Sequence, residues 1–408
     1  MKCRHCAAEL RLPWLDLGSA PYSNGYLTPE SLQAPEPWFP LKVLVCTSCW
    51  LVQTEDRVDA EALFTDQYAY FSSFSETWLN HAEAYVDAMS ERFRLDRNSH
   101  VVEIAANDGY LLQYVQRRGI PCLGIEPTAS TAHAARQKGI EILEAFFSSD
   151  LGSDLAAEGR AADLITANNV LAHVPDINDF LRGIASLLKP DGVVTFEFPH
   201  LLRLVQGSQF DTIYHEHFSY LSLTALKGIL ESNRLSVFDV TPLPTHGGSL
   251  RVFAQRADSK THQPCPGLAE GLAEEARAGI QQEAFYSAFQ AEANRIKHEF
   301  LAFALEVRKS GKSLAAYGAA AKGNTFLNFA GVRPDLLPFV VDRNPAKQGK
   351  FLPGSRIPIL PELALRERRP DYVLLLPWNL KEELVQQLAY IHEWGGRCVT
   401  AVPSVEFL

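Results

Sequence analysis

The chain lacks any long apolar run. No segment of its 408 residues approaches the roughly 20 consecutive apolar residues that a membrane-spanning helix needs, so we expect no membrane partner. No apolar stretch of signal-peptide type follows Met1 either, which favours a cytoplasmic protein with reduced thiols. Hydrophobic residues at 47% and charged residues at 21% are typical of a soluble globular protein, and the length predicts two or three domains.

Positive charge is also scarce. The chain has 38 Lys and Arg residues against 48 Asp and Glu residues, which gives a net charge of -10. This balance argues against a nucleic-acid partner, because nucleic-acid binding depends on a broad basic surface. It leaves room for one local basic pocket that binds a phosphorylated small molecule.

The first strand-turn-helix unit lacks the G-x-G-x-x-G spacing of a dinucleotide site. Residues 100–104 predict a strand, residues 105–109 a tight turn of small residues and residues 110–115 a helix. The next strand, at 122–127, carries Glu126 about twenty residues further on, where an acid can accept hydrogen bonds from a ribose. A ribose-bearing ligand without a phosphate at this turn is therefore favoured, and S-adenosylmethionine is a common one. Residues 161–167 add a strand that is followed by Asn168, Asn169 and His173.

Four of the seven cysteines form two pairs, each separated by two residues. Cys3 pairs with Cys6, and Cys46 pairs with Cys49. Two such knuckles supply the four thiolates of a structural zinc site, so we predict one zinc ion in the N-terminal module. The alternative is a group of buried free thiols.

Residues 210–220 concentrate proton-exchanging groups in an apolar stretch. Tyr214, His215, Glu216 and His217 are consecutive, and burying such side chains without a purpose is costly. We predict an active-site strand or loop here. The alternative is a surface turn with solvated histidines.

The last third of the chain repeats the pattern of strand, small-residue turn and helix. After a helical run predicted at 280–309, strands are expected at 313–317, 339–341 and 372–376, which favours a second Rossmann-like sheet. Lys322 in the turn and Lys347 after the second strand make a diphosphate a plausible guest. The alternative is an α/β domain with solvated lysines that serves packing or dimerisation.

The sequence resembles the nucleotide-sugar C-methyltransferase family, which makes branched deoxysugars, over essentially its whole length. The matching pieces, in order, are the two cysteine pairs and residues 68–75 (YAYFSSFS), 103–112 (EIAANDGYLL), 169–173 (NVLAH), 214–217 (YHEH), 246–251 (HGGSLR) and 317–323 (YGAAAKG). One departure is Ala105, where methyltransferases of this class often carry glycine.

The resemblance implies an α/β protein of three parts: a zinc-binding N-terminal module (1–65), a class I (Rossmann-like) S-adenosylmethionine domain (66–255) and a Rossmann-like C-terminal domain (256–408). The implied substrate is a dTDP-linked 4-keto-deoxysugar. We predict cofactor contacts from Tyr70, Glu103, Ala105, Asn107, Asp108, Glu126, Asn168 and Asn169. We predict substrate contacts from His246, Arg251, Lys322, Asn324, Asp342, Asn344, Lys347, Pro377 and Trp378.

Methylation next to a ketone requires a base and a donor to the enolate oxygen. We predict His217 as the base, with Tyr214 as the alternative base or the oxyanion donor, and C3 as the methylated carbon. Glu216 is expected to orient the sugar or a histidine, and the resemblance adds Tyr68 and His173 to the same pocket.

Two other functions remain open at the level of sequence. One is a metal-dependent enzyme that binds its ion through His215, Glu216 and His217. The other is a non-catalytic protein that binds nucleotide sugars or nucleic acid. The sequence does not decide between a monomer and a homodimer.

Overall fold

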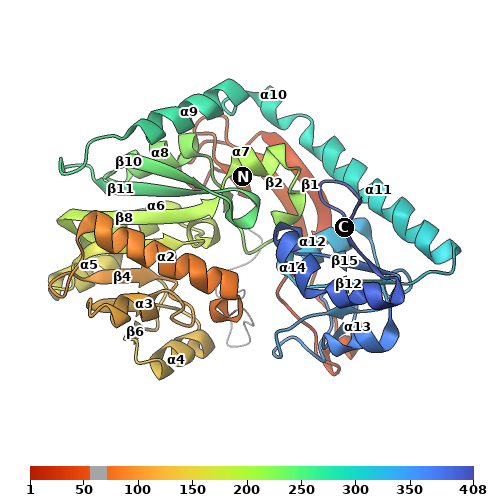
Figure 1. The fold of residues 1–408 in the computed structure, drawn as a ribbon. Helices are drawn as coiled ribbons and strands as arrows, with labels where there is room; N and C mark the ends of the chain where they lie inside the picture. Colours follow the sequence, from red (N-terminus) through yellow and green to blue (C-terminus); the bar gives the residue numbers. More distant parts are fainter. Residues whose placement is uncertain (56–70) are drawn as a thin grey trace.

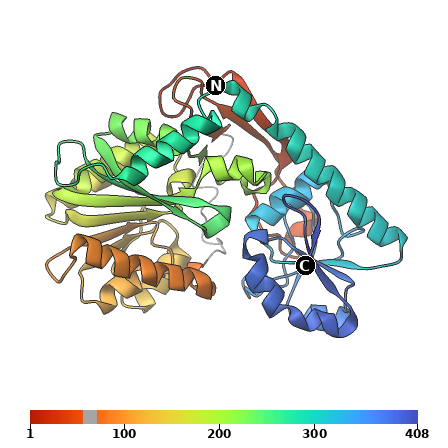
Figure 2. The same cartoon turned by 45° about the horizontal axis from the view of Figure 1, so that its top comes forward.

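The computed structural model describes residues 1–55 and 71–408, and these residues form three β-sheets of four, seven and six strands (Figure 1). The predicted α/β fold with an N-terminal cysteine-containing module and two further α/β parts is confirmed. Figure 2 shows the seven-stranded and six-stranded sheets in two separate lobes, with a long helix, α11 (Phe289–Lys309), running along the C-terminal lobe.

The four-stranded sheet joins the N-terminal module to the middle of the chain. Its order is β1-β2-β3-β9, in which Val52 of β3 pairs with Tyr220 of β9. The strands are β1 (Leu12–Ala20), β2 (Phe39–Val45), β3 (Val52–Thr54) and β9 (Ser219–Tyr220). Because β9 directly follows the polar segment (residues 214–217), this pairing fixes that segment against the N-terminal module.

The seven-stranded sheet has the order β10-β11-β8-β7-β4-β5-β6. The chain runs from β4 outward to β6 and then returns to β7 on the other side of β4. Strand order therefore reverses between β4 and β7, and ligands of such sheets bind beyond the carboxyl ends of the strands at this point. The strands are β4 (Val101–Ile104), β5 (Cys122–Ile125), β6 (Ile142–Leu143), β7 (Ala162–Asn168), β8 (Leu188–Pro199), β10 (Leu235–Leu243) and β11 (Ser249–Arg256).

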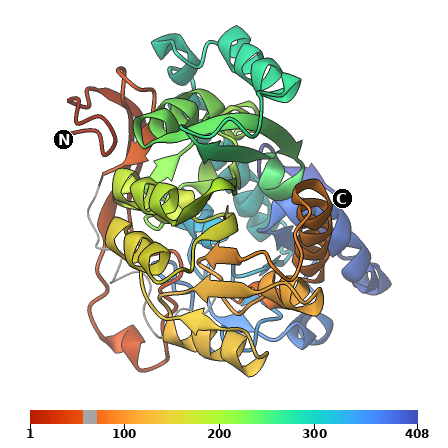
Figure 3. The same ribbon diagram turned by 90° about the vertical axis from the view of Figure 1, so that its left-hand side faces the viewer.

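Helices cover both faces of this sheet, and Figure 3 shows them from the side of the lobe that contains it, with the cysteine-containing N-terminus at the left edge of the view. Helix α6 has a wide apolar face that includes Ile177, Leu181 and Ile184, which explains its burial. The helices are α2 (Glu76–Phe93), α3 (Leu112–Arg117), α4 (Ala129–Gln137), α5 (Ser149–Ala157), α6 (Ile177–Leu187), α7 (Leu201–Gln206) and α8 (Leu223–Ser232).

The six-stranded sheet repeats the reversal of strand order, here between β12 and β15. Its strands are β12 (Leu314–Tyr317), β13 (Val340–Val341), β14 (Ile359–Leu360), β15 (Tyr372–Leu375), β16 (Arg397–Thr400) and β17 (Glu406–Phe407). Its helices are α12 (Ala321–Ala330), α13 (Leu363–Arg368) and α14 (Lys381–Gln387). Gly318 follows β12 with a φ of +88°, and a Cβ there would lie 2.5 Å from Cγ of Pro377, so the turn requires glycine.

The predicted helical run at 280–309 is interrupted. It contains α10 (Glu283–Tyr286) and α11 (Phe289–Lys309), with residues 287 and 288 between them. Helix α9 (Pro266–Ala278) precedes the run and ends at Gly279, whose φ is 80°. A left-handed glycine ends a helix at low cost, and the sequence analysis did not give Gly279 this role. Short 3-10 helices complete the fold: η1 (Ser31–Gln33), η2 (Ser72–Phe74), η3 (Leu171–His173), η4 (Phe210–Thr212), η5 (Thr245–Gly247), η6 (Trp378–Leu380) and η7 (Ala389–Trp394).

One apolar core spans the N-terminal and C-terminal parts of the chain. It includes Trp14 of β1, Phe210 of η4, Phe300 of α11 and Phe326 of α12. This shared core holds the polar segment between the two lobes. In the described ranges, no helix is both long and apolar enough to cross a membrane.

Candidate active site

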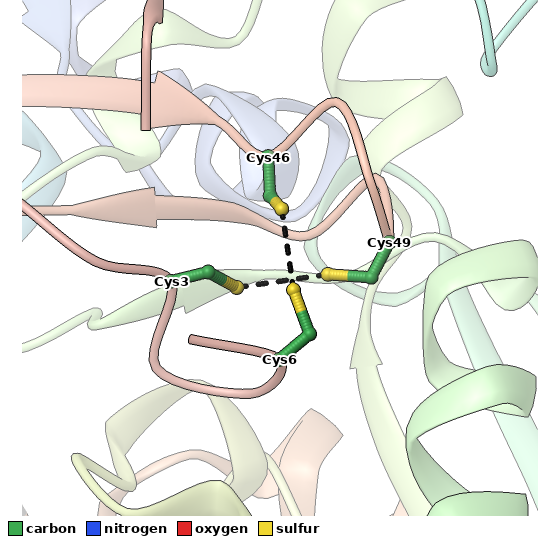
Figure 4. A group of neighbouring side chains, drawn as sticks. All are labelled: Cys3, Cys6, Cys46 and Cys49. Carbon is green, nitrogen blue, oxygen red and sulfur yellow. Dashed lines mark hydrogen bonds between the residues drawn. The ribbon is translucent and has the colours of Figure 1, made fainter. Parts of the chain in front are cut away.

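The four predicted zinc ligands converge. The sulfur atoms of Cys3, Cys6, Cys46 and Cys49 all lie within 4.8 Å of one another, and Figure 4 shows them pointing toward a common centre. Two sulfur pairs are 3.6 Å and 3.5 Å apart. A zinc tetrahedron with bonds of about 2.3 Å has sulfur-sulfur edges of about 3.8 Å, so the cysteines fit a zinc ion.

A cavity of about 770 Å³ opens between the lobes, and all three parts of the chain line it. The N-terminal module contributes Asn24, and the C-terminal domain contributes Ala320, Ala321, Lys322 and Lys347. The remaining described lining residues come from the middle of the chain. The cavity therefore lies where the carboxyl ends of β4, β5 and β7 face the turn after β12.

Tyr214, His217 and His173 meet in this cavity. The ring centroids of Tyr214 and His217 are 3.9 Å apart, and those of His173 and His217 are 4.7 Å apart. Nδ1 of His217 lies 2.9 Å from the carbonyl oxygen of Thr212, and Nδ1 of His173 lies 2.7 Å from that of Glu216. Because a carbonyl oxygen only accepts, each Nδ1 carries the proton, and each Nε2 is the acceptor nitrogen.

Burial keeps these histidines neutral. It lowers the pKa of His217 well below 6.5, and positive charge on His173 would lower it further. Burial also lowers the pKa of His173 to about 4, although the Glu216 carbonyl opposes the shift. Both imidazoles are therefore uncharged near pH 7, which is the form that can accept a proton.

The other two members of the polar segment face away from the cavity. His215 contacts the carbonyl oxygens of Phe39 and Pro40 through Nε2, at 3.3 Å and 3.2 Å. Oε1 of Glu216 accepts hydrogen bonds from the backbone and side-chain amides of Asn24, at 3.1 Å and 3.3 Å. Glu216 thus holds a cavity-lining residue in place without lining the cavity itself.

Five of the predicted cofactor residues line the cavity: Ala105, Asn107, Glu126, Asn168 and Asn169. Ala105 and Asn107 have φ values of 57° and 51°, which explains why glycine suits position 105. Oε2 of Glu126 accepts a hydrogen bond from the Asn107 amide at 2.8 Å and ties the turn to the next strand.

Glu103 and Asp108 lie behind this wall and are not among its lining residues. Burial, followed by the charges of Asp108 and Glu126, raises the pKa of Glu103 well above its usual range. Asp108 accepts a hydrogen bond from the Ser73 amide at 3.3 Å. Glu103 is therefore buried behind the turn, and Asp108 connects the turn to Ser73.

These residues fit S-adenosylmethionine. Glu126 presents a carboxylate at the cavity, and Oδ1 of Asn168 is buried without a hydrogen-bond partner in the described part of the chain. Such an acceptor suits the hydroxyl and amino groups of the cofactor.

Three predicted substrate residues line the opposite wall: His246, Lys322 and Lys347. Nζ of Lys322 donates to Oδ1 of Asn379 at 2.7 Å, and Nζ of Lys347 donates to the Ala319 carbonyl at 2.9 Å. Burial lowers the pKa of Lys322, whereas Asp211 opposes this shift. The cavity therefore has amino groups on its C-terminal side.

The structure does not bring the other predicted substrate residues into the cavity lining. Arg251 is buried against Glu197, with Nε 2.6 Å from Oε1. Asn324 donates to the Ser23 carbonyl. Asp342 accepts from the amides of Ala319 and Asn344, Pro377 packs on Gly318, and Trp378 donates to Asp211. Sequence spacing predicts where turns occur, but it does not predict which polar side chains form hydrogen bonds within the protein and so do not line the cavity.

Two predicted residues, Tyr68 and Tyr70, lie outside the described residues. Asn24, Trp78 and Phe146 are among the lining residues that the sequence did not predict. Phe146 follows β6, whose carboxyl end is at the same edge of the sheet as that of β5, so strand order gives a signal for it. Asn24 lies far from any motif, whereas Trp78 follows the motif at 68–75 by three residues.

Comparison with protein families matches the chain in three pieces. Residues 3–64 match a putative zinc-binding domain, residues 78–238 a methyltransferase domain, and residues 244–403 a C-methyltransferase C-terminal domain.

The relatives include the C-methyltransferase NovU of Streptomyces niveus, which is 36% identical over 99% of this chain and 96% of NovU. A ubiquinone biosynthesis O-methyltransferase of Coxiella burnetii (strain Dugway 5J108-111) is 22% identical over 48% of this chain and 90% of its own length. Magnesium protoporphyrin IX methyltransferase (ChlM) from Synechocystis PCC 6803, solved with bound SAH, is 17% identical with a TM-score of 0.36, over 44% of this chain and 83% of that one.

The likeness to NovU covers all three parts of the chain, which agrees with the converged cysteines and with the cavity that five of the predicted cofactor residues line. The substrate is a small molecule. The chain belongs to the C-methyltransferase family and is an S-adenosylmethionine-dependent C-methyltransferase with an N-terminal zinc-binding domain.

Proposed function

We propose that the chain methylates C3, next to the ketone, of a dTDP-linked 4-keto-deoxysugar in the cytoplasm. The observation that supports this proposal is the shared cavity, which is lined by Tyr214, by His217, which burial keeps neutral, by five of the predicted cofactor residues and by the two lysines of the C-terminal domain. A carbon acid needs a base, and a diphosphate needs cations. The cavity offers both.

In this proposal His217 is the base. The Thr212 carbonyl, 2.9 Å from Nδ1, fixes the tautomer in which Nε2 accepts a proton. Burial keeps the imidazole neutral, so no proton has to be lost before the reaction. Because burial disfavours the charged imidazolium, His217 releases the abstracted proton to solvent after turnover.

Tyr214 is the proposed donor to the enolate oxygen. Its ring packs on His217 with centroids 3.9 Å apart, so both side chains can reach adjacent atoms of one sugar. A hydroxyl placed beforehand at the developing oxyanion stabilises it more than mobile water does. If Tyr214 is instead the base, Tyr214→Phe should lower kcat more than His217→Asn does.

S-adenosylmethionine supplies an electrophilic methyl group when bound. We propose that Glu126 and Asn168 hold its polar groups and that Ala105 and Asn107 form the turn against which it packs. Glu103 and Asp108 act through that turn. Tyr68 and Tyr70 remain proposed contacts.

Lys322 and Lys347 are the proposed partners of the diphosphate, with His246 beside them on the same wall. Arg251, Asn324, Asp342, Asn344, Pro377 and Trp378 are proposed to shape this wall from behind. The boundaries 1–65, 66–255 and 256–408 remain a proposed division of the chain.

The metal-dependent alternative has less support. Among the described residues, the four cysteines are the one group of three or more His, Cys, Asp or Glu side chains placed to hold an ion. His215 and His217 point in different directions, because the chain turns at residues 215 and 216.

The test is incubation with S-adenosylmethionine and a panel of dTDP-linked 4-keto-deoxysugars, followed by mass spectrometry. The proposal predicts a gain of one methylene on at least one of them, located at C3 by NMR. Methylation of ketone-free substrates alone would overturn it. If no sugar gains a methylene, the enzyme methylates a substrate of another class.

A further inference from the structure

A buried carboxylate, Asp211, lies three residues before the polar segment and has no part in the proposed chemistry. It belongs to η4, between the buried Phe210 and Thr212, and is 1% exposed. Oδ1 of Asp211 has no hydrogen-bond partner among the described residues. A carboxylate is costly to bury in this way, so its presence calls for a specific role.

Oδ2 of Asp211 joins the two lobes. It accepts a hydrogen bond of 2.7 Å from the indole Nε1 of Trp378, which lies on η6 of the C-terminal domain. Trp378 also lies against the turn of η5, because a Cβ at Gly247 would be 2.7 Å from its ring. The indole therefore contacts two segments: η4, which precedes the polar segment, and η5, which contains His246.

Lys322 lies on the face of the same indole. Its Nζ is 4.7 Å from the centre of the Trp378 ring, and it lines the cavity. Burial raises the pKa of Asp211 to about 6, and the charge of Lys322 opposes this rise. A positive group at the cavity is thus linked through one aromatic ring to Asp211.

Asp211 is also one peptide bond from the group that orients His217. The Thr212 carbonyl accepts the Nδ1 proton of His217 at 2.9 Å. The hydroxyl of Thr325 in α12 donates to the Ile213 carbonyl at 2.9 Å, so the C-terminal domain grips this stretch twice. A shift of Asp211 would move the Thr212 carbonyl and turn the imidazole.

We propose that Asp211 is a positioning residue which, through the Trp378 indole, locks the Thr212 carbonyl and hence His217 in register with Lys322 of the C-terminal domain. This inference rests on the proposed function of His217. In this inference Trp378 aligns the two lobes and does not need to contact the substrate.

Trp378→Phe is the sharpest variant, because phenylalanine keeps an aromatic face for Lys322 and removes the N–H that Asp211 accepts. We expect kcat to fall by about 10-fold or more, since small displacements of a catalytic group are costly, whereas KM for the nucleotide sugar stays within about twofold. Asp211→Ala should behave alike. Asp211→Asn, which keeps an acceptor oxygen, should recover most of the lost kcat.

Trp394→Phe is the matched control. Trp394 lies in the same domain, and its Nε1 donates to the Pro370 carbonyl at 2.9 Å, away from the cavity lining. This variant also loses one indole hydrogen bond, so it reports the cost of a structural change alone. We expect it to keep both kcat and KM.

A second readout does not depend on turnover. In a chain labelled with ¹⁵N-histidine, the ring signal of His217, assigned by its loss in His217→Asn, should show an Nδ1 proton in the wild type and in Trp394→Phe. It should change in Trp378→Phe and Asp211→Ala. If the wild type methylates no ketosugar, the proposed function fails and this signal still decides the role of Asp211. An unchanged signal, or kcat losses no larger than that of Trp394→Phe, would overturn the inference.

Discussion

The four-cysteine cluster and the polar segment are both rich in reactive side chains, but the side chains of the cluster converge and those of the polar segment diverge. The cysteines come from two chain segments about 40 residues apart and point their sulfur atoms toward one centre. Residues 214–217 are consecutive and send their side chains apart. Tyr214 and His217 enter the cavity, His215 contacts Phe39 and Pro40, and Glu216 holds Asn24.

The difference shows what sequence spacing does and does not encode. Two cysteine pairs, each with two residues between its members, imply one shared metal ion, and binding that ion requires the four sulfur atoms to converge. A run of polar residues implies no common target, because successive side chains cannot all face one way. Each member of the polar segment therefore needs its own test.

Removing one cysteine should give the largest effect. Cys46→Ser should reduce zinc from one ion per chain to none, and since structural zinc contributes on the order of 10 kcal/mol, the N-terminal module should become sensitive to protease. Metal analysis and limited proteolysis measure this. Cys122→Ser, at a cysteine outside the cluster, is the control and should keep its zinc. A Cys46→Ser chain with a full zinc content would break the account of the cluster.

Substitutions of the two histidines of the polar segment should give the next largest effects, and these effects should differ. His217→Asn should lower kcat by about 10² to 10⁴-fold, the usual contribution of a general base, with the affinity for S-adenosylmethionine unchanged. His215→Asn should keep most of kcat and lower the free energy of unfolding by about 1–3 kcal/mol, because its ring donates to buried carbonyls. Steady-state kinetics and urea unfolding check both. Equal losses of kcat would contradict the divergence of the segment.

Tyr214→Phe should have a smaller effect on turnover than His217→Asn. Losing one donor to the oxyanion costs about 10²-fold in kcat in well-studied enzymes, and the aromatic contact with His217 is kept. The measurement is kcat with the same nucleotide sugar. A loss larger than that of His217→Asn would exchange the roles of the two residues.

The pH dependence should show the smallest effect. Burial and the neighbouring groups His173, His246 and Lys322 lower the pKa of His217, so kcat/KM should not decrease between pH 7.5 and about 6.5, where an exposed histidine would begin to protonate. A decrease centred near 6.5 that is absent from His217→Asn would contradict the burial of this base.

Stability should follow the same titration. In the unfolded chain these histidines bind protons below about 6.5, whereas folded His173 binds one only near 4. The unfolded state therefore holds more protons in this interval, and the free energy of unfolding should fall as the pH drops from about 6.5 toward 4. Urea titrations across that range measure it.

Much of the fold follows from local patterns in the sequence. The apolar runs at 101–104, 122–125 and 314–317 are strands as expected, because short apolar runs bounded by small residues have few alternatives. The pairing of β9 with β3 could not be read, since it depends on contacts between distant segments, whereas the end of α9 at Gly279 is a local signal.

The candidate site was partly readable for a related reason. Turn positions after strands marked Glu126, Asn168 and Lys322, which do line the cavity. Arg251 was misplaced because its partner, Glu197, lies on the neighbouring strand and is 54 residues away in sequence. Trp78 and Asn24 carry no motif, so only the folded chain shows them at the cavity.

The most direct test of the central claim follows the sugar's own proton. A dTDP-linked 4-keto-deoxysugar that is a substrate is incubated in deuterium oxide with the enzyme and S-adenosylhomocysteine, which has no methyl group to give, and deuterium at C3 is measured by NMR. The account predicts enzyme-dependent incorporation that His217→Asn loses and His215→Asn keeps. Incorporation at the wild-type rate in both His217→Asn and Tyr214→Phe would contradict it.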